Sequence, residues 1–594
     1  ENISGIIADT EEGQAEEQKQ RSHNEQQRFD SLVAAFSPAF SELLPLVMRV
    51  MTFPKDYNGD DPHEEDEQKK FRYNSADMLH SISTVLSSHG TLSRICSSLE
   101  QVFQQFQQDQ NNWQPLEACL YCIRSIARKV DDQEEHLMPT VMKTIPHICH
   151  SRHLRYTGNL IVGRYSSWIN RHPDFLQDSL KFVIDGLNHK PVQSSAALAF
   201  KFLCEGCFQH LLSSPTIENL FTLYEVSLSP STSLTLANQM EIIEGLCCMV
   251  SALPSEKVMP ACMQLIAPIA NQLIAATNEP DKNSQLTDSL DKLAHFFSSL
   301  HPKMNNNPDS VMLACVEITK RLWGVFEKIV EKYKENDREM EKLCRMWKYG
   351  MRVTKQHFAP MLPPLLTSLA HCFQQTPRCC FLYTVSVCLG TFRDHPEVRE
   401  LLQGVYSTFV EKALTILTSP DQFREHPDLV EDFFDMVTRY LKNFQDFVFQ
   451  TSSFAKVFEC GLHGCLLQHK EAFVAVCTFF TEALHTRGPQ GQVVTALLQQ
   501  FGPALFLACL QGLAGALPES RVSHVITILL CAKACHSHAT QHLMHLALTK
   551  MPDVHGPTKE EFLEVFVSSR EDKCVFVIDV AFFELLFCLL CLFA

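Results

Sequence analysis

The stretches WQPLEACLYCIRSIARKV (113–130) and LRYTGNLIVGRYSSWINRHPDFL (154–176) decide the fold, because each has a helical pattern and such patterns recur with regular punctuation. Alternating runs of β-branched residues are almost absent, so strands are not expected. Each predicted pair of helices takes roughly 40 residues, the period of stacked helix hairpins. The helical segments are predicted at residues 113–130, 134–150, 153–171, 173–188, 216–229, 234–252, 256–277, 284–300, 308–334, 337–356, 358–374 and 378–392.

This repeat indicates an all-α protein of the HEAT-repeat type, an α-solenoid in which antiparallel helix hairpins form a superhelix. One hairpin cannot bury both of its apolar faces, whereas stacked neighbours can. We therefore expect a curved rod whose long surface wraps a partner. Four prolines are predicted to open second helices, where the missing N–H group costs no helical hydrogen bond. They are Pro173, Pro191, Pro396 and Pro427.

Length and composition fit this interpretation. With 594 residues the chain is too long for a single hydrophobic core. Hydrophobic residues make up 45% and charged residues 20%, which is ordinary for a folded protein. The net charge of −17 disfavours non-specific binding of nucleic acid and favours basic partners. The 24 cysteines lie mostly in apolar helical stretches and are interpreted as small buried residues in a reducing compartment.

The pattern along the chain predicts six segments. They are a polar end expected to be a loop (1–27), helical repeats with an acidic loop at 54–70 (28–112), further helical repeats (113–336), a basic helix (337–358), more helical repeats (359–570) and an atypical apolar tail (571–594). The acidic loop is either a solvated connector or a contact for a basic partner.

The tail VFVIDVAFFELLFCLLCLFA (575–594) is the one stretch that resembles a membrane span, but Asp579 and Glu584 interrupt it. An acid at the centre of a membrane helix costs about 2.5–3.5 kcal/mol. A buried final helix or a mis-joined sequence end is favoured over an anchor, and no membrane is expected. The first residue is Glu, so we expect a fragment or a mature form, and no signal peptide opens it.

Catalytic and metal-binding motifs are not found. There is no G-x-G-x-x-G, G-K-[ST] or G-x-S-x-G sequence. The pairs Cys119/Cys122, Cys204/Cys207 and Cys588/Cys591 have no second pair at zinc spacing, and core packing is favoured for them. Two histidine clusters are expected to cap helix ends rather than to bind metal; they are His147, Cys149, His150 and His153, and Cys535, His536, His538, His542 and His545. We expect no enzyme, no cofactor and no metal site.

One segment, DREMEKLCRMWKYGMRVTKQHF (337–358), has a pattern of basic residues that indicates a candidate binding site. Its basic residues are spaced by 4, 3, 3, 4 and 3 positions and fall within an arc of roughly 140° on a helix. They are Arg338, Lys342, Arg345, Lys348, Arg352 and Lys355. The apolar residues Met340, Leu343, Cys344, Trp347, Met351 and Phe358 fall on the opposite side.

Two interpretations of this basic stripe remain open. It is either a solvated basic face or a site for a ligand with repeated anions, such as phosphoserines, each contact contributing about 1.5–3 kcal/mol. Only two acids, Glu339 and Glu341, lie nearby, whereas a neutral solvated face would interleave acid–base pairs. Gly350 inside the helix indicates close approach of a backbone or ligand, or a tolerated weakness.

Six stretches together carry a resemblance to a known family. They are WQPLEACLYCIRSIARKV (113–130), LRYTGNLIVGRYSSWINRHPDFL (154–176), KPVQSSAALAFKFLCEGC (190–207), CCFLYTVSVCLG (379–390), HPDLVEDFFDMVTRYL (426–441) and FRYNSADML (71–79). With them the sequence resembles the transportin-SR branch of the β-karyopherins, the import receptors for Ser/Arg-rich (RS) splicing and mRNA-binding proteins. The resemblance covers roughly residues 28–550, and the tail departs from it.

In that family a helix with a row of arginines recognises the phosphorylated RS domain of cargo. EKLCRMWKYGMR (341–352) resembles that helix, with Lys342, Arg345, Lys348 and Arg352 at the basic positions and Arg338 one turn earlier. Lys342 and Lys348 stand where the family has Arg, and lysine lacks the planar fork that grips phosphate.

The resemblance also implies other partners and a place of action. It implies binding of Ran-GTP, weak or absent here because N-terminal repeats are missing, with a remaining acidic contact at Asp60, Asp61, Glu64, Glu65 and Asp66. It further implies Phe-Gly nucleoporin binding, no direct nucleic-acid contact, and shuttling between cytoplasm and nucleus through the pore. The alternatives are a karyopherin of a neighbouring importin branch with other cargo, or a generic HEAT scaffold.

Overall fold

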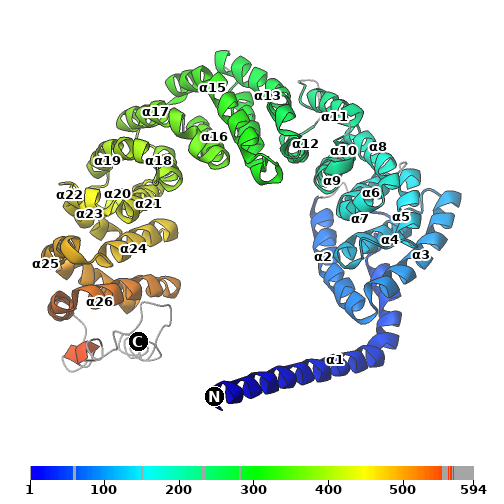
Figure 1. Ribbon diagram of the computed structural model, residues 1–594, viewed down its shortest axis with the longest axis horizontal. Coiled ribbons are helices and arrows are strands. Elements are labelled where there is room, and N and C mark those ends of the chain that lie inside the picture. Colours follow the sequence, from blue (N-terminus) through cyan, green and yellow to red (C-terminus); the bar gives the residue numbers. More distant parts are fainter. Residues whose placement is uncertain are drawn as a thin grey trace. The chain divides into compact units, whose positions relative to one another are not determined.

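The computed structural model is all-helical in the part of the chain that it describes (Figure 1). The described residues are 2–57, 62–148, 151–212, 214–229, 234–279, 282–551, 559–560, 562–564 and 566. They divide into two compact units, Glu1–Ile269 with Ser299–Ser310, and Ala270–Ser298 with Val311–Ala594. The two units are called unit 1 and unit 2, and each is described by itself.

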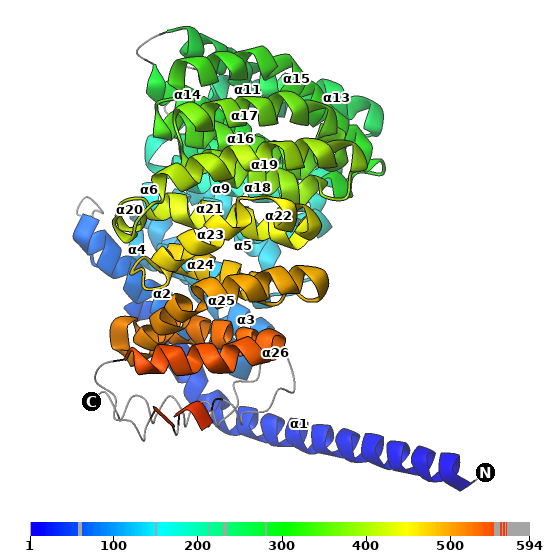
Figure 2. The ribbon, with the colours of Figure 1, turned by 90° about the vertical axis from the view of Figure 1, so that its left-hand side faces the viewer.

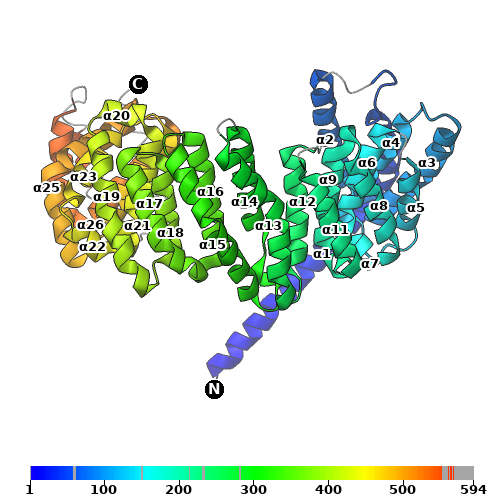
Figure 3. The same ribbon diagram turned by 90° about the horizontal axis from the view of Figure 1, so that it is seen from above.

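Unit 1 consists of two layers of antiparallel helices that follow the chain order. Helices α2, α4, α6, α9 and α12 contact their successors and form one layer, in which Figure 3 shows α6, α9 and α12 side by side, and α3, α8 and α11 pack against this layer. The bounds are α1 Asn2–Val50, α2 Pro62–Val85, α3 Ser88–Gln108, α4 Gln114–Ser125, α5 Met138–Thr144, α6 Arg152–Arg164, α7 Ser166–Arg171, α8 Leu176–Leu187, α9 Gln193–Gly206, α10 Phe208–Leu211, α11 Ser214–Ser227 and α12 Leu236–Ser251.

Unit 2 repeats the same arrangement. Helices α16, α18, α21, α24 and α26 stack in order as one layer, and α15, α17, α19, α23 and α25 stack as the other (Figure 2). The bounds are α14 Asn283–Ser299, α15 Pro308–Tyr333, α16 Asp337–Thr354, α17 Leu362–Gln375, α18 Cys379–Phe392, α19 Pro396–Ile416, α20 Pro420–Glu425, α21 Pro427–Asn443, α22 Gln445–Gln450, α23 Phe454–Gly461, α24 Lys470–Leu484, α25 Gly488–Gln511 and α26 Glu519–Thr549. Helix α13 (Ser255–Asn278) belongs to unit 1 up to Ile269 and to unit 2 from Ala270 on.

The core lies between the two layers and is rich in aromatic side chains. In unit 2, Phe434 of α21 packs with its ring centroid 5.1 Å from that of Phe433 and 5.3 Å from that of Phe479 on α24. All three side chains are fully buried. Because burial of a phenylalanine contributes about 1.5–3 kcal/mol, rows of such residues hold successive hairpins together.

The predicted helical segments match the observed helices closely, but the pairing of two of them was wrong. The sequence pairs 153–171 with 173–188, whereas in the structure α8 pairs with α9, and α6 stacks on α4 and α9. Pro427 opens α21, and Pro191 lies in the 3₁₀ turn Lys190–Val192 just before α9; both helices are the second of their pairs, as predicted. Pro396 instead opens α19, and Pro173 opens the 3₁₀ turn Pro173–Phe175 just before α8; these helices are the first of their pairs. A proline can mark the start of a helix in either layer. It therefore cannot show whether that helix is the first or the second of its pair.

Two segments expected to be loops are helical. Residues 2–27, in the segment predicted as a polar loop, belong to α1, and residues 62–70 of the predicted loop 54–70 belong to α2, which Pro62 opens. Glu, Gln, Lys and Arg have high intrinsic helix propensity, so polar composition without an apolar period is compatible with helix. The apolar tail expected at 571–594 lies outside the described residues.

Three helices in the described part of the chain are long and apolar enough to cross a membrane, judged by length and composition. They are Gln26–Val50, Ser255–Asn278 and Gly488–Ala516. In the second and third, apolar side chains such as Leu273 and Leu498 are buried against neighbouring helices. The packing of these two helices explains why they are apolar. The expectation that the protein does not bind a membrane stays a prediction.

Candidate functional site: the basic face of α16

Helix α16 is amphipathic, and its apolar side is the one predicted. The six apolar residues expected on that side, Met340 to Phe358, are all buried. The Trp347 ring lies 6.3 Å from that of Trp323 and 6.4 Å from that of Phe326, both on α15. This packing fixes the rotation of α16 about its axis, so the basic residues face away from the core.

The basic residues of the predicted stripe do not share one environment. Arg338, Arg345 and Arg352 are exposed, whereas Lys342 and Lys348 are half-buried. The Lys342 ammonium lies 2.7 Å from Oδ2 of Asp291 on α14, and both side chains are largely covered. Lys342 is therefore neutralised within unit 2, which the spacing in the sequence could not show.

Two of the remaining cations lie beside aromatic rings. The Lys348 ammonium is 5.4 Å from the ring centroid of Tyr349 and 5.6 Å from that of Tyr383 on α18. The Arg345 guanidinium is 5.8 Å from the Tyr349 ring. Contacts of this kind contribute about 0.5–1 kcal/mol at exposed sites and leave the hydrogen-bond donors free for a ligand. Within the described residues, Arg338, Arg345, Lys348 and Arg352 have no carboxylate ion pair.

Lys355 does not continue the stripe. Helix α16 ends at Thr354, and Lys355 adopts φ 48° at the start of the following 3₁₀ segment. A side chain in this backbone region leaves the helical period, so the prediction that all six cations share one helical arc was wrong for Lys355. The continuous row that survives is Arg338, Arg345, Lys348 and Arg352.

The structure adds acidic neighbours that the sequence analysis missed. Burial raises the pKa of Glu341, while the adjacent Lys348, Arg345 and Lys342 lower it. On α21, burial and then the charges of Glu431, Asp435, Glu341 and Asp428 raise the pKa of Asp432 to about 8. The 428–435 spacing of these acids is visible in the sequence and could have indicated an acidic face. The layer α16–α18–α21 thus carries a cationic row on α16 and an acidic cluster on α21, with α18 between them.

Steric crowding does not explain why residue 350 is glycine. A Cβ atom built there would lie 3.8 Å from the Phe297 ring, which is ordinary van der Waals contact. Of the explanations open from the sequence, close approach of another backbone within this chain is therefore wrong. A tolerated weakness in the helix agrees with the geometry.

Three of the acidic residues expected to contact Ran, Glu64, Glu65 and Asp66, lie in unit 1, whereas α16 lies in unit 2. Glu64, Glu65 and Asp66 belong to the first turns of α2. Asp60 and Asp61 lie outside the described residues. Their role stays a prediction.

The described cysteine pairs named from the sequence are buried, and two histidines of the named clusters contact neighbouring protein groups. The pairs Cys119/Cys122 and Cys204/Cys207 are buried thiols, whereas Cys588/Cys591 lies outside the described residues. The His153 ring stacks 4.2 Å from Trp113. His536 lies 3.1 Å from the Leu484 carbonyl oxygen and 2.9 Å from the Thr495 hydroxyl. Among the described residues no three His, Cys, Asp or Glu side chains are placed to hold a metal ion.

Comparison with known proteins places α16 within a recognised region. A family model described as the Transportin-3/Importin-13 fourth TPR domain matches residues 314–417, which contain α16. A second, the Transportin-3/Importin-13 third TPR domain, matches residues 135–222. The two matches together cover about a third of the chain.

Curated relatives extend the similarity over most of the chain. Transportin MOS14 of Arabidopsis thaliana is 27% identical over 509 residues, which are 83% of this chain and 52% of that protein. Importin-13 of Gallus gallus is 24% identical over 525 residues, 85% of this chain and 54% of that protein. The chain thus spans about half the length of the curated relatives it matches.

A solved structure supports the fold. The protein in "Importin13 cytosolic state" superimposes with a TM-score of 0.79 at 18% identity, over 95% of this chain and 64% of that one. This likeness confirms the predicted HEAT-type α-solenoid. The chain is thus similar to transportin and importin-13 proteins, and these likenesses do not separate the transportin-SR branch from the importin-13 branch.

Proposed function

We propose that this chain is part of a nuclear import receptor that carries phosphorylated RS-type splicing or mRNA-binding proteins into the nucleus. The observation that carries the proposal is the exposed row Arg338, Arg345 and Arg352, with Lys348 beside it, on the helix inside the matched region 314–417. These cations have no carboxylate ion pair within the described residues, so they are available to a partner. The proposed activity is binding and release, with no catalytic step.

The charge pattern around α16 suits such a cargo. An RS segment carries cationic arginines and, when phosphorylated, dianionic serines. The cations of α16 offer donors to phosphate. Helix α21, which lies beyond α18 in the same layer, carries the acids Asp428, Glu431 and Asp435. A layer with groups of both signs therefore favours a ligand that carries both signs.

Further partners belong to the same proposal. Cargo release would be controlled by Ran-GTP, with the acidic residues 60–66 as part of the contact, and passage through the pore would use Phe-Gly nucleoporins. The protein would shuttle between cytoplasm and nucleus. These partners rest on the karyopherin likeness alone.

The second candidate is an import receptor of the importin-13 branch with a different cargo. It is favoured by the named relatives and by the salt bridge at Lys342, which removes one cation from the row. The two candidates differ in one property, because only RS-type cargo makes binding depend on phosphorylation.

The test is fluorescence anisotropy with a labelled RS-repeat peptide, phosphorylated or not, at two salt concentrations. The proteins are the wild-type chain and Arg345→Glu/Lys348→Glu/Arg352→Glu. A matched control, Lys320→Glu/Lys328→Glu/Lys456→Glu, makes the same charge change at exposed lysines of α15 and α23. Since each charge-assisted contact contributes about 1.5–3 kcal/mol, reversal on α16 should weaken phosphopeptide binding at least 10-fold. The control should stay within twofold.

Phosphate-dependent binding that salt weakens and α16 reversal abolishes supports the RS-cargo receptor. Binding that ignores phosphate, or equal losses in the α16 and control variants, contradicts it. Cargo binding by the full-length protein that Ran-GTP does not affect would favour a scaffold instead.

A further inference from the structure

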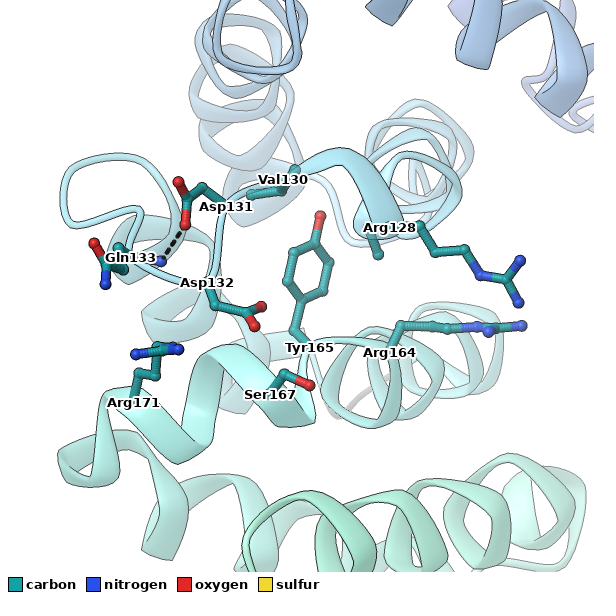
Figure 4. Close-up of a pocket in the computed structure, with 10 residues that line it drawn as sticks. Arg128, Val130, Asp131, Asp132, Gln133, Arg164, Tyr165, Ser167 and Arg171 are labelled. Carbon is teal, nitrogen blue, oxygen red and sulfur yellow. Dashed lines mark hydrogen bonds between the residues drawn. The ribbon is translucent and has the colours of Figure 1, made fainter. Parts of the chain in front are cut away.

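A second group of arginines lies in unit 1, outside the α16 site. Arg124 is in the last turn of α4, Arg128 is in the 3₁₀ turn Ala127–Lys129, and Arg164 is in the last turn of α6. Helices α4 and α6 are neighbours in one layer, so the three positions converge. Figure 4 shows the Arg128 and Arg164 side chains running side by side in the same direction.

The backbone around these arginines is firmly positioned. The Tyr165 hydroxyl donates a 2.9 Å hydrogen bond to the Ile123 carbonyl oxygen, which fastens the end of α6 to α4. The Trp168 indole donates a 2.7 Å hydrogen bond to the Glu134 carbonyl oxygen and fixes the 130–134 loop. The arginines therefore stand on rigid elements, as a preformed binding site requires.

Two of these arginines, Arg128 and Arg164, border an open cavity of about 460 Å³. Arg128, Arg164 and Arg171 line it, and Asp132 enters it from the 130–134 loop (Figure 4). Small-molecule pockets are mostly apolar, whereas half of the ten residues that line this cavity are charged, three arginines and two aspartates. It is better suited to a charged group on a partner chain than to an apolar ligand.

Helix dipoles explain only part of this arrangement. A cation in the last turn of an α-helix gains about 0.3–1 kcal/mol, which accounts for Arg124 and Arg164 singly. It does not account for the approach of three arginines that form no ion pair within the described residues. Burial and then the charges of Arg124 and Arg128 lower the pKa of Arg164, a sign that the guanidinium groups repel one another.

Other basic residues of the same layer have acidic partners. Arg72 lies 2.7 Å from Glu117, and Lys201 lies 2.9 Å from Glu241 and 3.4 Å from Glu244. Arg155 pairs with Asp185. Within the described residues, Arg124, Arg128 and Arg164 have no such ion pair. The convergent set therefore lacks the anion that its neighbours have.

We propose that Arg124, Arg128 and Arg164 form a second docking site, which binds a phosphorylated serine or threonine side chain of a partner protein. Three adjacent guanidinium groups match a dianion better than a single carboxylate, and their planar forks bind phosphate oxygens bidentately. The Asp132 carboxylate then receives a basic residue next to the phosphorylated one. This inference does not depend on the cargo proposed for α16.

The test removes the α16 site first, so that the two sites are separated. The parent protein is the full chain with Arg345→Glu/Lys348→Glu/Arg352→Glu. Onto it are added Arg128→Glu/Arg164→Glu, the conservative Arg128→Lys/Arg164→Lys, or the control Lys143→Glu/Lys181→Glu at exposed lysines of α5 and α8. The probes are a labelled peptide with one phosphoserine followed by Arg, its Ser and Glu counterparts, and a short single-stranded RNA. Thermal unfolding of every variant checks folding.

The parent is expected to bind the phosphoserine peptide at least 10-fold more tightly than the Ser or Glu peptide. Arg128→Glu/Arg164→Glu should remove at least 10-fold of this affinity, the lysine variant should lose severalfold, and the control should stay within twofold. A parent that does not distinguish the phosphopeptide, or that is unaffected by arginine reversal, overturns the proposal.

Other outcomes overturn it in informative ways. Equal binding of the Glu peptide would make the site a general acidic-peptide site, and arginine-dependent RNA binding without phosphopeptide binding would assign it to nucleic acid. If the wild-type chain loses all phosphopeptide binding on α16 reversal, the import proposal stands and this one falls. If α16 reversal has no effect but Arg128→Glu/Arg164→Glu does, the reverse holds.

Discussion

Lys342 and Arg345 both belong to the basic stripe predicted on α16, but their surroundings differ. Lys342 is paired with Asp291 at 2.7 Å in a half-buried setting, whereas Arg345 is exposed, lies beside the Tyr349 ring and forms no ion pair within the described residues. Breaking a covered pair leaves Asp291 without its partner, while removing an exposed arginine leaves the fold intact.

We therefore expect Lys342→Ala to lower the thermal unfolding midpoint and to keep RS-phosphopeptide affinity within about twofold of wild type. Arg345→Ala should do the opposite, with an unchanged midpoint and severalfold weaker binding. The midpoint from circular dichroism and the affinity from anisotropy check this pair. A larger affinity loss for Lys342→Ala than for Arg345→Ala would show that Lys342 exchanges Asp291 for the ligand.

Asp432 makes the stability of unit 2 depend on pH. Its pKa is raised to about 8 by burial and by neighbouring acids, while an unfolded aspartate titrates near pH 4. Between about pH 4 and 8 the unfolded chain has released this proton and the folded chain still holds it. The contribution of Asp432 to the free energy of unfolding therefore falls as pH rises through this window.

Asp432→Asn should consequently raise the unfolding midpoint relative to wild type at pH 8.5 and change it little at pH 4. The measurement is thermal unfolding of both proteins across this range. Asp178→Asn on α8, where the aspartate is exposed, is the control and should show no such trend. A midpoint difference that is independent of pH would mean that Asp432 is ionised in the folded chain throughout.

At the scale of the helix, two glycines show why space decides the effect of a side chain. Gly350 in α16 has free space for a Cβ, whereas a Cβ at Gly461 in α23 would lie 2.9 Å from the Phe480 ring. We expect Gly350→Ala to stabilise the chain by about 0.5–1 kcal/mol through helix propensity. Gly461→Ala should destabilise it by about 1–3 kcal/mol through overpacking. Denaturant unfolding measures both changes, and stabilisation by both variants would contradict the packing at α23.

The sequence predicted the bounds of the helices better than the contacts that their side chains make. Long apolar periods placed α13, α15 and α16 within a few residues, because packing of one helical face leaves a periodic record. It failed at α1, where a polar Glu/Gln-rich segment is helical without such a period. It failed also at Lys355, because the end of α16 is set by local backbone geometry. The Asp291 partner of Lys342 is 51 residues distant, and no local pattern records such a contact.

At the scale of the molecule, the two units carry different charge features on the same kind of layer. Unit 2 presents the α16 row and the acids of α21, and unit 1 presents the converging arginines of α4 and α6. Because the net charge of the chain is −17, these two groups of cations stand out on an otherwise acidic protein. Such contrast steers a ligand with anionic groups to defined positions rather than over the whole surface.

The most direct test of the central claim is a double-mutant cycle between Arg345 and the peptide phosphates. It uses the affinities of wild-type chain and Arg345→Ala for the phosphorylated and unphosphorylated RS peptide. A direct contact predicts a coupling energy of at least about 1 kcal/mol, roughly fivefold in affinity, while the same cycle with Lys342→Ala gives a value near zero. Coupling near zero at Arg345 would contradict the claim that the α16 row binds cargo phosphate.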